Sequence, residues 1–442
     1  MKIIKLSCCL IALILLALPA KAELFGLKGY VLDNGMRLIV VPNHKAPIAK
    51  HMVWYKVGAA DEKLGKGGSA HLLEHLMFRG TKKVKGQAFN RILEKNGAES
   101  NAFTAQDVTA YHQLVDISRL ELAMALEADR MKNLKIDEDS FETERQIVYQ
   151  ERKQVVENNP LYKFSEELQR IFWQNHPYSR PITGSESEIL ALTRQDIMDI
   201  YHNYYAPNNA ILVIAGDIEP DMAYKLATKY YGSIKATKIE NNRAVYNADV
   251  DSKTILEMKL PKVELTRLVK KYHVPGYSVA KDKIYAYMVL SKYLGDSDVS
   301  KLYADLVVKN KIATVVSTDY NFTSSGGGSF DFSAVPSKGV SVDELKKSLD
   351  EAIMKAMSEL DDTGLERVKT QMLSGLAYVK DNPNDAAQIV GMLATAGMAD
   401  EEIENYADNI KKVDVADVKN AFNEMIKSAQ AEAVIEPRGA EK

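Results

Sequence analysis

Cysteine is nearly absent from this chain. Its 442 residues include only 2 cysteines, Cys8 and Cys9, which lie within the first 22 residues. The rest of the chain therefore has neither disulfide bonds nor a thiol nucleophile. The chain also has no strong excess of either charge, since it contains 57 Lys and Arg and 60 Asp and Glu, which gives a net charge of −3. This near-neutral, slightly acidic balance does not favour a nucleic-acid binder.

The first 22 residues have the pattern of a secretory signal peptide. They begin with basic MKIIK, continue with apolar LSCCLIALILLALP and end in the small-x-small cleavage site Ala20-Lys21-Ala22. A membrane anchor is the alternative, but the apolar run is too short to span a bilayer comfortably. Cleavage before Glu23 removes three lysines, so 54 basic residues then face 60 acidic ones and the net charge becomes −6. We therefore expect an exported protein, most simply a periplasmic one, with no stable membrane insertion after cleavage.

The remaining length divides into two parts of similar plan. We expect an α+β domain at residues 23–235 and another at residues 253–442, joined by a polar linker at residues 236–252. Each domain is expected to contain an antiparallel-rich sheet packed by helices, and the order of strands and helices repeats although the residues do not. A long helix is expected at residues 141–159, ended by Pro160. The segment SSGGGS at residues 324–329 predicts a hairpin loop, because it lacks the lysine and the helix start of a phosphate-binding loop.

The motif HLLEH at residues 71–75 carries the strongest indication of chemistry. Residues four apart share one face of a helix, so His71 and His75 can direct both imidazoles at one point. Glu74 lies close enough to reach a water on a metal held there. Two core or surface histidines that happen to fall at helical spacing are the alternative. The leucines and methionine around the motif argue against a solvated helix, and the pattern favours a metal site.

A catalytic zinc site needs a third protein ligand and one open position. The helix expected at residues 141–159 offers Glu144 and Glu151, which are seven residues, or two turns, apart and so lie on nearly the same face. Two inward-facing carboxylates are costly to bury unless they are paired or bound to a metal. The second helix is therefore the candidate source of the missing ligand.

Several segments resemble one peptidase family. GGSAHLLEHLMFRGT resembles the inverted zinc motif HxxEH of the pitrilysin/insulinase family, the inverzincins. ERQIVYQE resembles the ERxVxxxE helix of that family, NAFTAQDVTAY its NAxTxxxxTxY strands, and YYAPNNAILVIAGDI the strand that ends its first domain. The resemblance spans essentially the whole chain after residue 22. It is strongest to the short two-domain branch that is similar to mitochondrial processing peptidase.

This resemblance implies a role for each matching residue. His71, His75 and Glu151 would be the ligands of Zn²⁺, Glu74 the general base, and Glu144 a carboxylate that supports the site from behind the ligands. Zinc would lower the pKa of its water towards about 7, and Glu74 would take the proton and return it to the leaving amine. The strand residues Asn101, Ala102 and Phe103 would pair with an extended peptide substrate as an added strand. Ordinary sheet packing is the alternative for these three residues.

The chain departs from the family pattern in its second half. The family carries an Arg and a Tyr, separated by six residues, that bind substrate and stabilise the oxyanion. In the matching segment LVVKNKIAT, Val307 stands at the Arg position and Thr314 at the Tyr position. Loss of such donors typically costs several kcal/mol of transition-state stabilisation. We therefore expect a zinc-binding subunit that acts on peptides together with a paralogous Arg/Tyr-bearing subunit, as a heterodimer. A non-catalytic assembly or core subunit of the same fold is the alternative.

Overall fold

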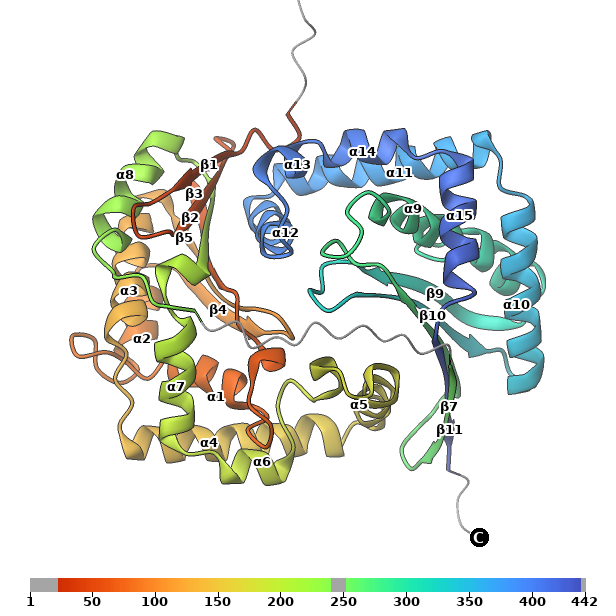
Figure 1. Ribbon diagram of the computed structural model, residues 1–442, viewed down its shortest axis with the longest axis horizontal. Coiled ribbons are helices and arrows are strands. Elements are labelled where there is room, and N and C mark those ends of the chain that lie inside the picture. The colour runs from red at the N-terminus through yellow and green to blue at the C-terminus, as the bar shows by residue number, and fades with distance from the viewer. Residues whose placement is uncertain (1–22, 240–251, 439–442) are drawn as a thin grey trace, which may run out of the picture.

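The computed structural model describes residues 23–239 and 252–438, which form two sheets and the helices around them (Figure 1). The expected signal peptide and most of the expected linker lie outside these described residues. The N-terminal sheet has six strands in the order β1-β2-β6-β3-β5-β4, and the C-terminal sheet has five in the order β7-β11-β8-β10-β9. The α+β fold with two antiparallel-rich sheets is confirmed.

The N-terminal sheet contains one parallel pair, β2 with β6, and its other neighbouring strands are antiparallel. Its strands are β1 Lys28–Val31, β2 Arg37–Pro42, β3 Ile48–Tyr55, β4 Glu99–Thr104, β5 Thr109–Asp116 and β6 Ala210–Gly216. The helices of this half are α1 Ser69–Leu76, α2 Ala88–Lys95, α3 Leu120–Asn133, α4 Glu138–Arg152, α5 Pro160–Trp173, α6 Glu186–Ala191, α7 Arg194–Tyr204 and α8 Pro220–Tyr231. Strand β4 ends the sheet on one side, so one of its edges is not covered by another strand of the residues that the structure describes.

The C-terminal half repeats this topology. Its parallel pair is β7 with β11, and β11-β8-β10-β9 follow in the antiparallel order that β6-β3-β5-β4 take in the first sheet. The strands are β7 Lys253–Leu260, β8 Arg267–Val274, β9 Ala313–Asn321, β10 Gly328–Pro336 and β11 Gln430–Pro437. The helices are α9 Ile284–Leu294, α10 Val342–Ser358, α11 Asp362–Asp381, α12 Pro383–Thr395, α13 Asp400–Glu404, α14 Tyr406–Lys412 and α15 Val415–Met425. The repeat predicted from element order is thus a repeat of sheet order as well.

The two halves cover each other's sheets. The run AILVIAG of β6 is buried at every position, which is typical of a strand that is covered on both faces. One face packs on the helices of its own half, and the other packs on α12 from the C-terminal half. In return, α5 of the N-terminal half packs on β7 and β11 of the second sheet. Figure 1 shows α5 and α12 between the two sheets. Each half therefore covers part of the other's sheet, and the two halves share a buried apolar interface.

Two local features refine the expectations. Helix α4 ends at Arg152 and continues as a π-helical turn at Lys153–Glu157, so it stops before the predicted residue 159. Pro160 begins α5 instead of merely ending α4, because proline has no N–H to lose in a first helical turn. The segment at residues 324–329 lies at the turn of the β9–β10 hairpin, as predicted, although its last two residues already belong to β10.

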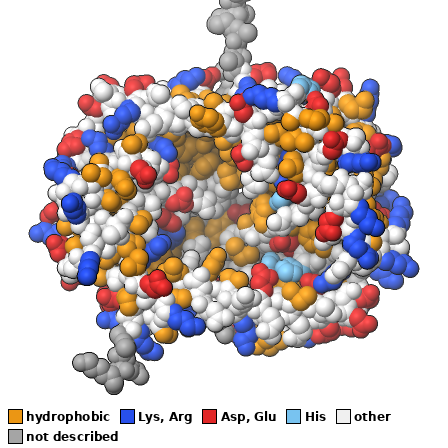
Figure 2. All heavy atoms as spheres, turned by 180° about the vertical axis from the view of Figure 1, so that it is seen from behind, with side chains coloured by type: hydrophobic (Ala, Val, Ile, Leu, Met, Phe, Trp, Pro, Cys, Tyr) orange, Lys and Arg blue, Asp and Glu red, His pale blue; other side chains and the backbone are white. Residues whose placement is uncertain are grey.

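The face opposite to that of Figure 1 is hollowed at its centre (Figure 2). Hydrophobic side chains gather inside the hollow, and charged side chains of both signs stand around it. Among the described residues, no helix combines the length and the apolar character needed to cross a membrane.

Candidate metal centre

The start of α1 is fixed by a buried carboxyl group. Glu62 accepts hydrogen bonds from the backbone N–H groups of Gly68 (3.0 Å) and Ala70 (2.8 Å), which are among the donors that a helix start leaves unpaired. Burial raises the pKa of Glu62 to about 8. Gly68 has φ 84°, and a Cβ there would lie 2.4 Å from the carbonyl oxygen of Thr183. Only glycine fits this close, left-handed position, so the orientation of α1 is set before its first turn.

Helix α1 buries its leucines and leaves its polar residues at the edge of the core. Leu72, Leu73 and Leu76 are fully buried, whereas the side chains of His71 and His75 are 12% and 24% exposed. The imidazole rings lie 4.9 Å apart between centroids and nearly perpendicular, at 78°. The predicted common face of the two histidines is therefore present.

Helix α4 brings the third residue to this face. Nε2 of His75 lies 3.4 Å from Oε2 of Glu151, and Nε2 of His71 lies 4.0 Å from Oε1. One nitrogen or oxygen from each of the three residues lies within 4.8 Å of the others. Burial and the neighbouring His75 lower the pKa of His71 to about 4, and the close contact with the His75 ring lowers the pKa of Glu151.

These three residues fit a zinc ion. Two imidazoles and one carboxylate form a donor set that catalytic zinc sites use, with a fourth position left for water or substrate. A lowered imidazole pKa keeps the lone pair of His71 free at neutral pH, and a lowered carboxyl pKa keeps Glu151 charged, as metal binding requires. The separation of the donor atoms allows all three to approach one ion.

Glu144 precedes Glu151 by two turns of α4, and its carboxylate lies next to the ring of His75. Its Oε2 is 3.1 Å from Nδ1 of His75, and Arg79 forms an ion pair with its Oε1. Because a carboxylate only accepts hydrogen bonds, Nδ1 of His75 carries the proton and its Nε2 keeps the lone pair. The Glu144 side chain is only 4% exposed, so its charge is compensated by Arg79 and His75 rather than by solvent.

Glu74 is held from the sheet. The hydroxyl of Thr104, at the end of β4, donates a 2.5 Å hydrogen bond to Oε2 of Glu74. Burial raises the pKa of Glu74, and this hydrogen bond lowers it in part. One carboxylate oxygen is thus anchored, and the other is available for a reacting group.

The three residues expected to contact substrate lie on the edge strand. Asn101, Ala102 and Phe103 are in β4, opposite His112, Tyr111 and Ala110 of β5. Asn101 is exposed and lines a pocket of about 450 Å³ together with Glu74, His75, Arg79 and Glu144. Phe103 packs edge-to-face on Trp54 with ring centroids 5.4 Å apart, which is the packing role that the alternative had given it. Asn101 therefore lies at the site, whereas the Phe103 side chain is directed to the core.

The positions expected to lack the Arg and Tyr groups are in the second half. Val307 is half-buried in the π-helical segment Tyr303–Lys309, and Thr314 is exposed on β9. The Thr314 hydroxyl is directed to its own hairpin, where it donates to the carbonyl oxygen of Val335 at 3.4 Å.

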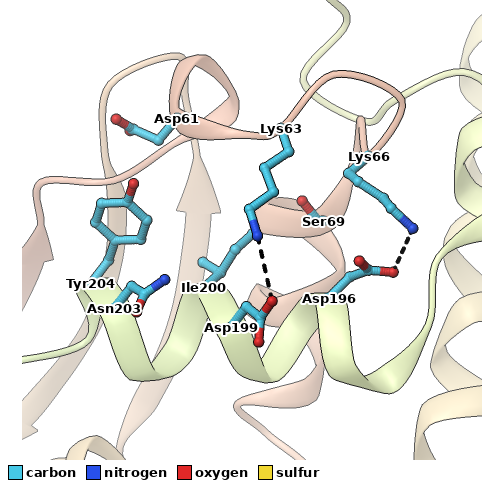
Figure 3. Close-up of a pocket in the computed structure, with 9 residues that line it drawn as sticks. All are labelled: Asp61, Lys63, Lys66, Ser69, Asp196, Asp199, Ile200, Asn203 and Tyr204. Carbon is cyan, nitrogen blue, oxygen red and sulfur yellow. Dashed lines mark hydrogen bonds and ion pairs between the residues drawn. The ribbon is translucent and has the colours of Figure 1, made fainter. Parts of the chain in front are cut away.

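A second, smaller pocket of about 70 Å³ lies beside the N-terminal end of α1 (Figure 3). Two ion pairs cross it: Lys66 with Asp196 at 2.8 Å, and Lys63 with Asp199 at 3.5 Å. The pairs join the loop before α1 to α7. The ion pairs therefore help to hold the start of the helix that carries His71 and His75 against α7.

Three residues at the site were not identified from the sequence: Glu62, Arg79 and Thr104. Arg79 and Thr104 both fall inside the quoted motifs, so their place in the chain was visible, but no pattern links either of them to its carboxylate partner. Glu62 lies in a loop with no motif at all. Only the tertiary structure brings each of them into contact with the helix or the carboxylate that it supports.

Comparisons with known proteins show which family the chain belongs to. Residues 37–186 match the family described as insulinase (peptidase family M16), and residues 191–372 match the peptidase M16 inactive domain. The zinc protease PqqE of Helicobacter pylori is 27% identical and is covered over 98% of each chain, and the mitochondrial-processing peptidase subunit beta of Lentinula edodes is 24% identical over 88% of this chain and 86% of its own. A crystal structure of a protease from Helicobacter pylori has a TM-score of 0.86 and 26% identity, over 93% of this chain and 99% of that one. The chain thus belongs to the insulinase family, peptidase family M16.

Proposed function

We propose that this protein is a zinc-dependent metalloendopeptidase that hydrolyses extended or unfolded peptides. The observation that carries the proposal is the convergence of His71, His75 and Glu151, with Glu74 anchored beside them. Three ligands and a separate carboxylate are what the hydrolysis of an amide at a metal needs.

The chemistry is divided between the metal and the chain. Bound zinc would act as a Lewis acid on the peptide carbonyl and lower the pKa of water. Glu74 takes a proton from the attacking water and returns it to the leaving amine. Thr104 holds one oxygen of Glu74, so the other stays directed at the reacting atoms. Glu144 keeps the proton of His75 on Nδ1 and so leaves Nε2 free as a ligand atom.

The substrate class follows from the uncovered edge of β4. A peptide in extended conformation can add to this edge through main-chain hydrogen bonds, which do not depend on its sequence. Such a strand would pass beside Asn101 and over the pocket that Glu74 and His75 line. A folded protein cannot offer the same isolated strand, so unstructured peptides are the expected substrates.

We propose further that activity requires a second subunit. Val307 has no hydrogen-bond donor on its side chain, and the short hydroxyl of Thr314 is turned to Val335, so neither can replace an Arg and a Tyr. A paralogous chain that carries these groups would supply the oxyanion donors in a heterodimer. The relative from Lentinula edodes is itself named as a subunit of a processing peptidase, which supports this reading. The pattern of residues 1–22 supports export to the periplasm.

Metal analysis, two substitutions of ligands and one of the general base test the proposal. The isolated chain should hold about one zinc, which His71→Ala or Glu151→Ala should remove. Glu74→Gln should keep the zinc and reduce kcat of the heterodimer by at least about 100-fold, since a general base contributes roughly 10²–10⁴-fold. Glu219→Gln, at a side chain that is 76% exposed, is the matched control and should change neither property.

Three results would count against the proposal. A chain without zinc would remove the metal site, and normal cleavage by Glu74→Gln would remove the assigned base. Zinc binding without cleavage of any unstructured peptide, even with the Arg/Tyr-bearing subunit present, would favour a non-catalytic assembly subunit instead.

A further inference from the structure

We propose that Arg79 is a positioning residue of the metal centre, which acts through Glu144 on His75. The inference rests on the proposed zinc site but concerns a residue that has no part in the chemistry itself. Arg79 pairs with one oxygen of Glu144, and the other oxygen accepts the Nδ1 proton of His75. Arg79, Glu144 and His75 are thus linked in series by an ion pair and a hydrogen bond, and the other ring nitrogen of His75, Nε2, is the ligand atom.

The backbone around Arg79 is held in place. Its N–H donates to the carbonyl oxygen of Leu76 at 3.0 Å, which continues α1 by a turn. Gly80 follows with φ 115°, and a Cβ there would lie 2.6 Å from the carbonyl oxygen of Val84. The carbonyl oxygen of Gly80 also accepts from Lys135 at 3.2 Å, at the start of the loop that leads to α4. Arg79 therefore extends from a turn that is hydrogen-bonded to the loop before the helix that carries Glu144.

Charge makes the pair necessary. The Glu144 side chain is 4% exposed, and burying a carboxylate is costly unless it is both hydrogen-bonded and paired with a positive charge. His75 supplies one hydrogen-bond donor, and Arg79 supplies the positive charge. A buried pair with one partner removed leaves an uncompensated charge, so Glu144 would turn towards solvent without Arg79 and release His75.

The two histidines differ in whether Nδ1 has a hydrogen-bond partner. Nδ1 of His71 is buried, and it has no hydrogen-bond partner among the residues that the structure describes. The orientation of the ligand set therefore depends on the His75 side, where Glu144 and Arg79 stand. A ligand whose orienting carboxylate is lost typically binds its metal 10–100-fold more weakly.

Arg79 also lines the 450 Å³ pocket, with 23% of its side chain exposed, so a direct contact with substrate is the competing explanation. A substrate contact would raise KM and leave zinc affinity unchanged. A positioning role changes zinc affinity in the absence of any substrate.

The test measures zinc affinity of the full chain by chelator competition, and the visible spectrum of its cobalt-substituted form. Arg79→Met should weaken zinc binding about 10-fold and alter the cobalt spectrum, while Arg79→Lys should restore affinity to within about 3-fold of wild type. Arg79→Gln, which keeps a polar side chain without the charge, should behave like the Met variant and replaces it if the Met variant does not fold. Arg170→Met is the matched control, because it breaks an exposed ion pair with Glu167 that has no link to the site.

A double-mutant cycle tests whether Arg79 acts on zinc binding through Glu144. If Arg79 acts through Glu144, then Arg79→Met together with Glu144→Gln should bind zinc no more weakly than Glu144→Gln alone. Additive losses, or wild-type affinity and spectrum in the Met and Gln variants, would overturn the inference while leaving the zinc site intact. A wild-type chain that binds no zinc would overturn the proposed function and this inference together.

Discussion

Gly391 offers a test of how the two halves are joined. It lies in α12 of the C-terminal half, against Trp54 of the N-terminal sheet. A Cβ at this position would lie 2.2 Å from Nε1, 2.3 Å from Cε2 and 2.7 Å from Cζ2 of the indole. Trp54 is only 1% exposed and packs edge-to-face on Phe103, so its ring cannot move aside. Gly391→Ala should therefore push α12 away from the sheet.

Two opposing effects set the magnitude. Replacing glycine by alanine inside a helix stabilises the helix by about 0.5–1 kcal/mol. Overpacking of a dense core costs about 1–3 kcal/mol. A contact of 2.2 Å must open by more than about 1 Å to reach the usual carbon contact of roughly 3.5–4 Å, which argues for the upper end of that range. We expect a net loss of about 2 kcal/mol in the free energy of unfolding.

Gly375 of α11 provides the matched control. It is also inside a helix, but it is exposed, and a Cβ there would meet nothing within 4 Å. Gly375→Ala should therefore be more stable than wild type by about 0.5–1 kcal/mol, from helix propensity alone. Chemical unfolding followed by far-UV circular dichroism measures both variants, and Trp54→Phe should recover part of the loss in Gly391→Ala. Equal stability of the two alanine variants would refute the contact between α12 and the sheet.

Two further predictions concern the site. Thr104→Val removes a charged hydrogen bond that is typically worth 1.5–3 kcal/mol, so kcat should fall about 10–100-fold at unchanged zinc content, whereas Thr104→Ser should retain most activity. An unchanged kcat in the Val variant would mean that Glu74 needs no anchor. Burial raises the pKa of Glu62 from 4.5 to about 8, so the folded protein near neutral pH holds a proton that the unfolded chain has released. The stability from this group is complete below about pH 4.5 and is lost as the pH rises through 8, with a slope that approaches 1.4 kcal/mol per pH unit. In metal-free protein, Glu62→Gln should remove this slope between pH 5 and 8, and identical pH profiles for the two chains would contradict the assignment.

The parts of the fold that follow from local pattern were predictable. Each pair of site residues lies on a single helix: His71 and His75 on one, Glu144 and Glu151 on the other. Their spacing along the chain was therefore enough to predict that each pair shares a helix face. The strands and helices of both halves also appear in the sequence as runs with period two or with helical spacing. A fully apolar run such as β6 even indicates that both of its faces are covered.

The sequence does not contain what covers that second face. Helix α12 is about 180 residues from β6 along the chain, and its glycine against Trp54 is unremarkable until the sheet is known. The same applies to Thr104 and Arg79, which each touch a carboxylate on another element. Such contacts are set by tertiary packing, and hydrogen-bonding side chains such as threonine and arginine can pair with many partners. One sequence holds no signal that selects among those partners.

Among the described residues, a group that could hold a metal ion is found only in the first half, and the burial of the first helix after β3 and after β8 accounts for this difference. Helix α9 has the place in the second sheet's topology that α1 has in the first, yet ten of its eleven residues are buried. Helix α1 buries only one face and leaves His71, Glu74 and His75 at the edge of the core, where ligand atoms remain accessible. A helix buried all round can carry no such group without a large desolvation cost. The second half instead contributes α12, which removes from water the apolar face of the first sheet that includes Met52 and Trp54. The first half therefore relies on α12 of the second half to cover this apolar face, independently of any part that the second half has in catalysis.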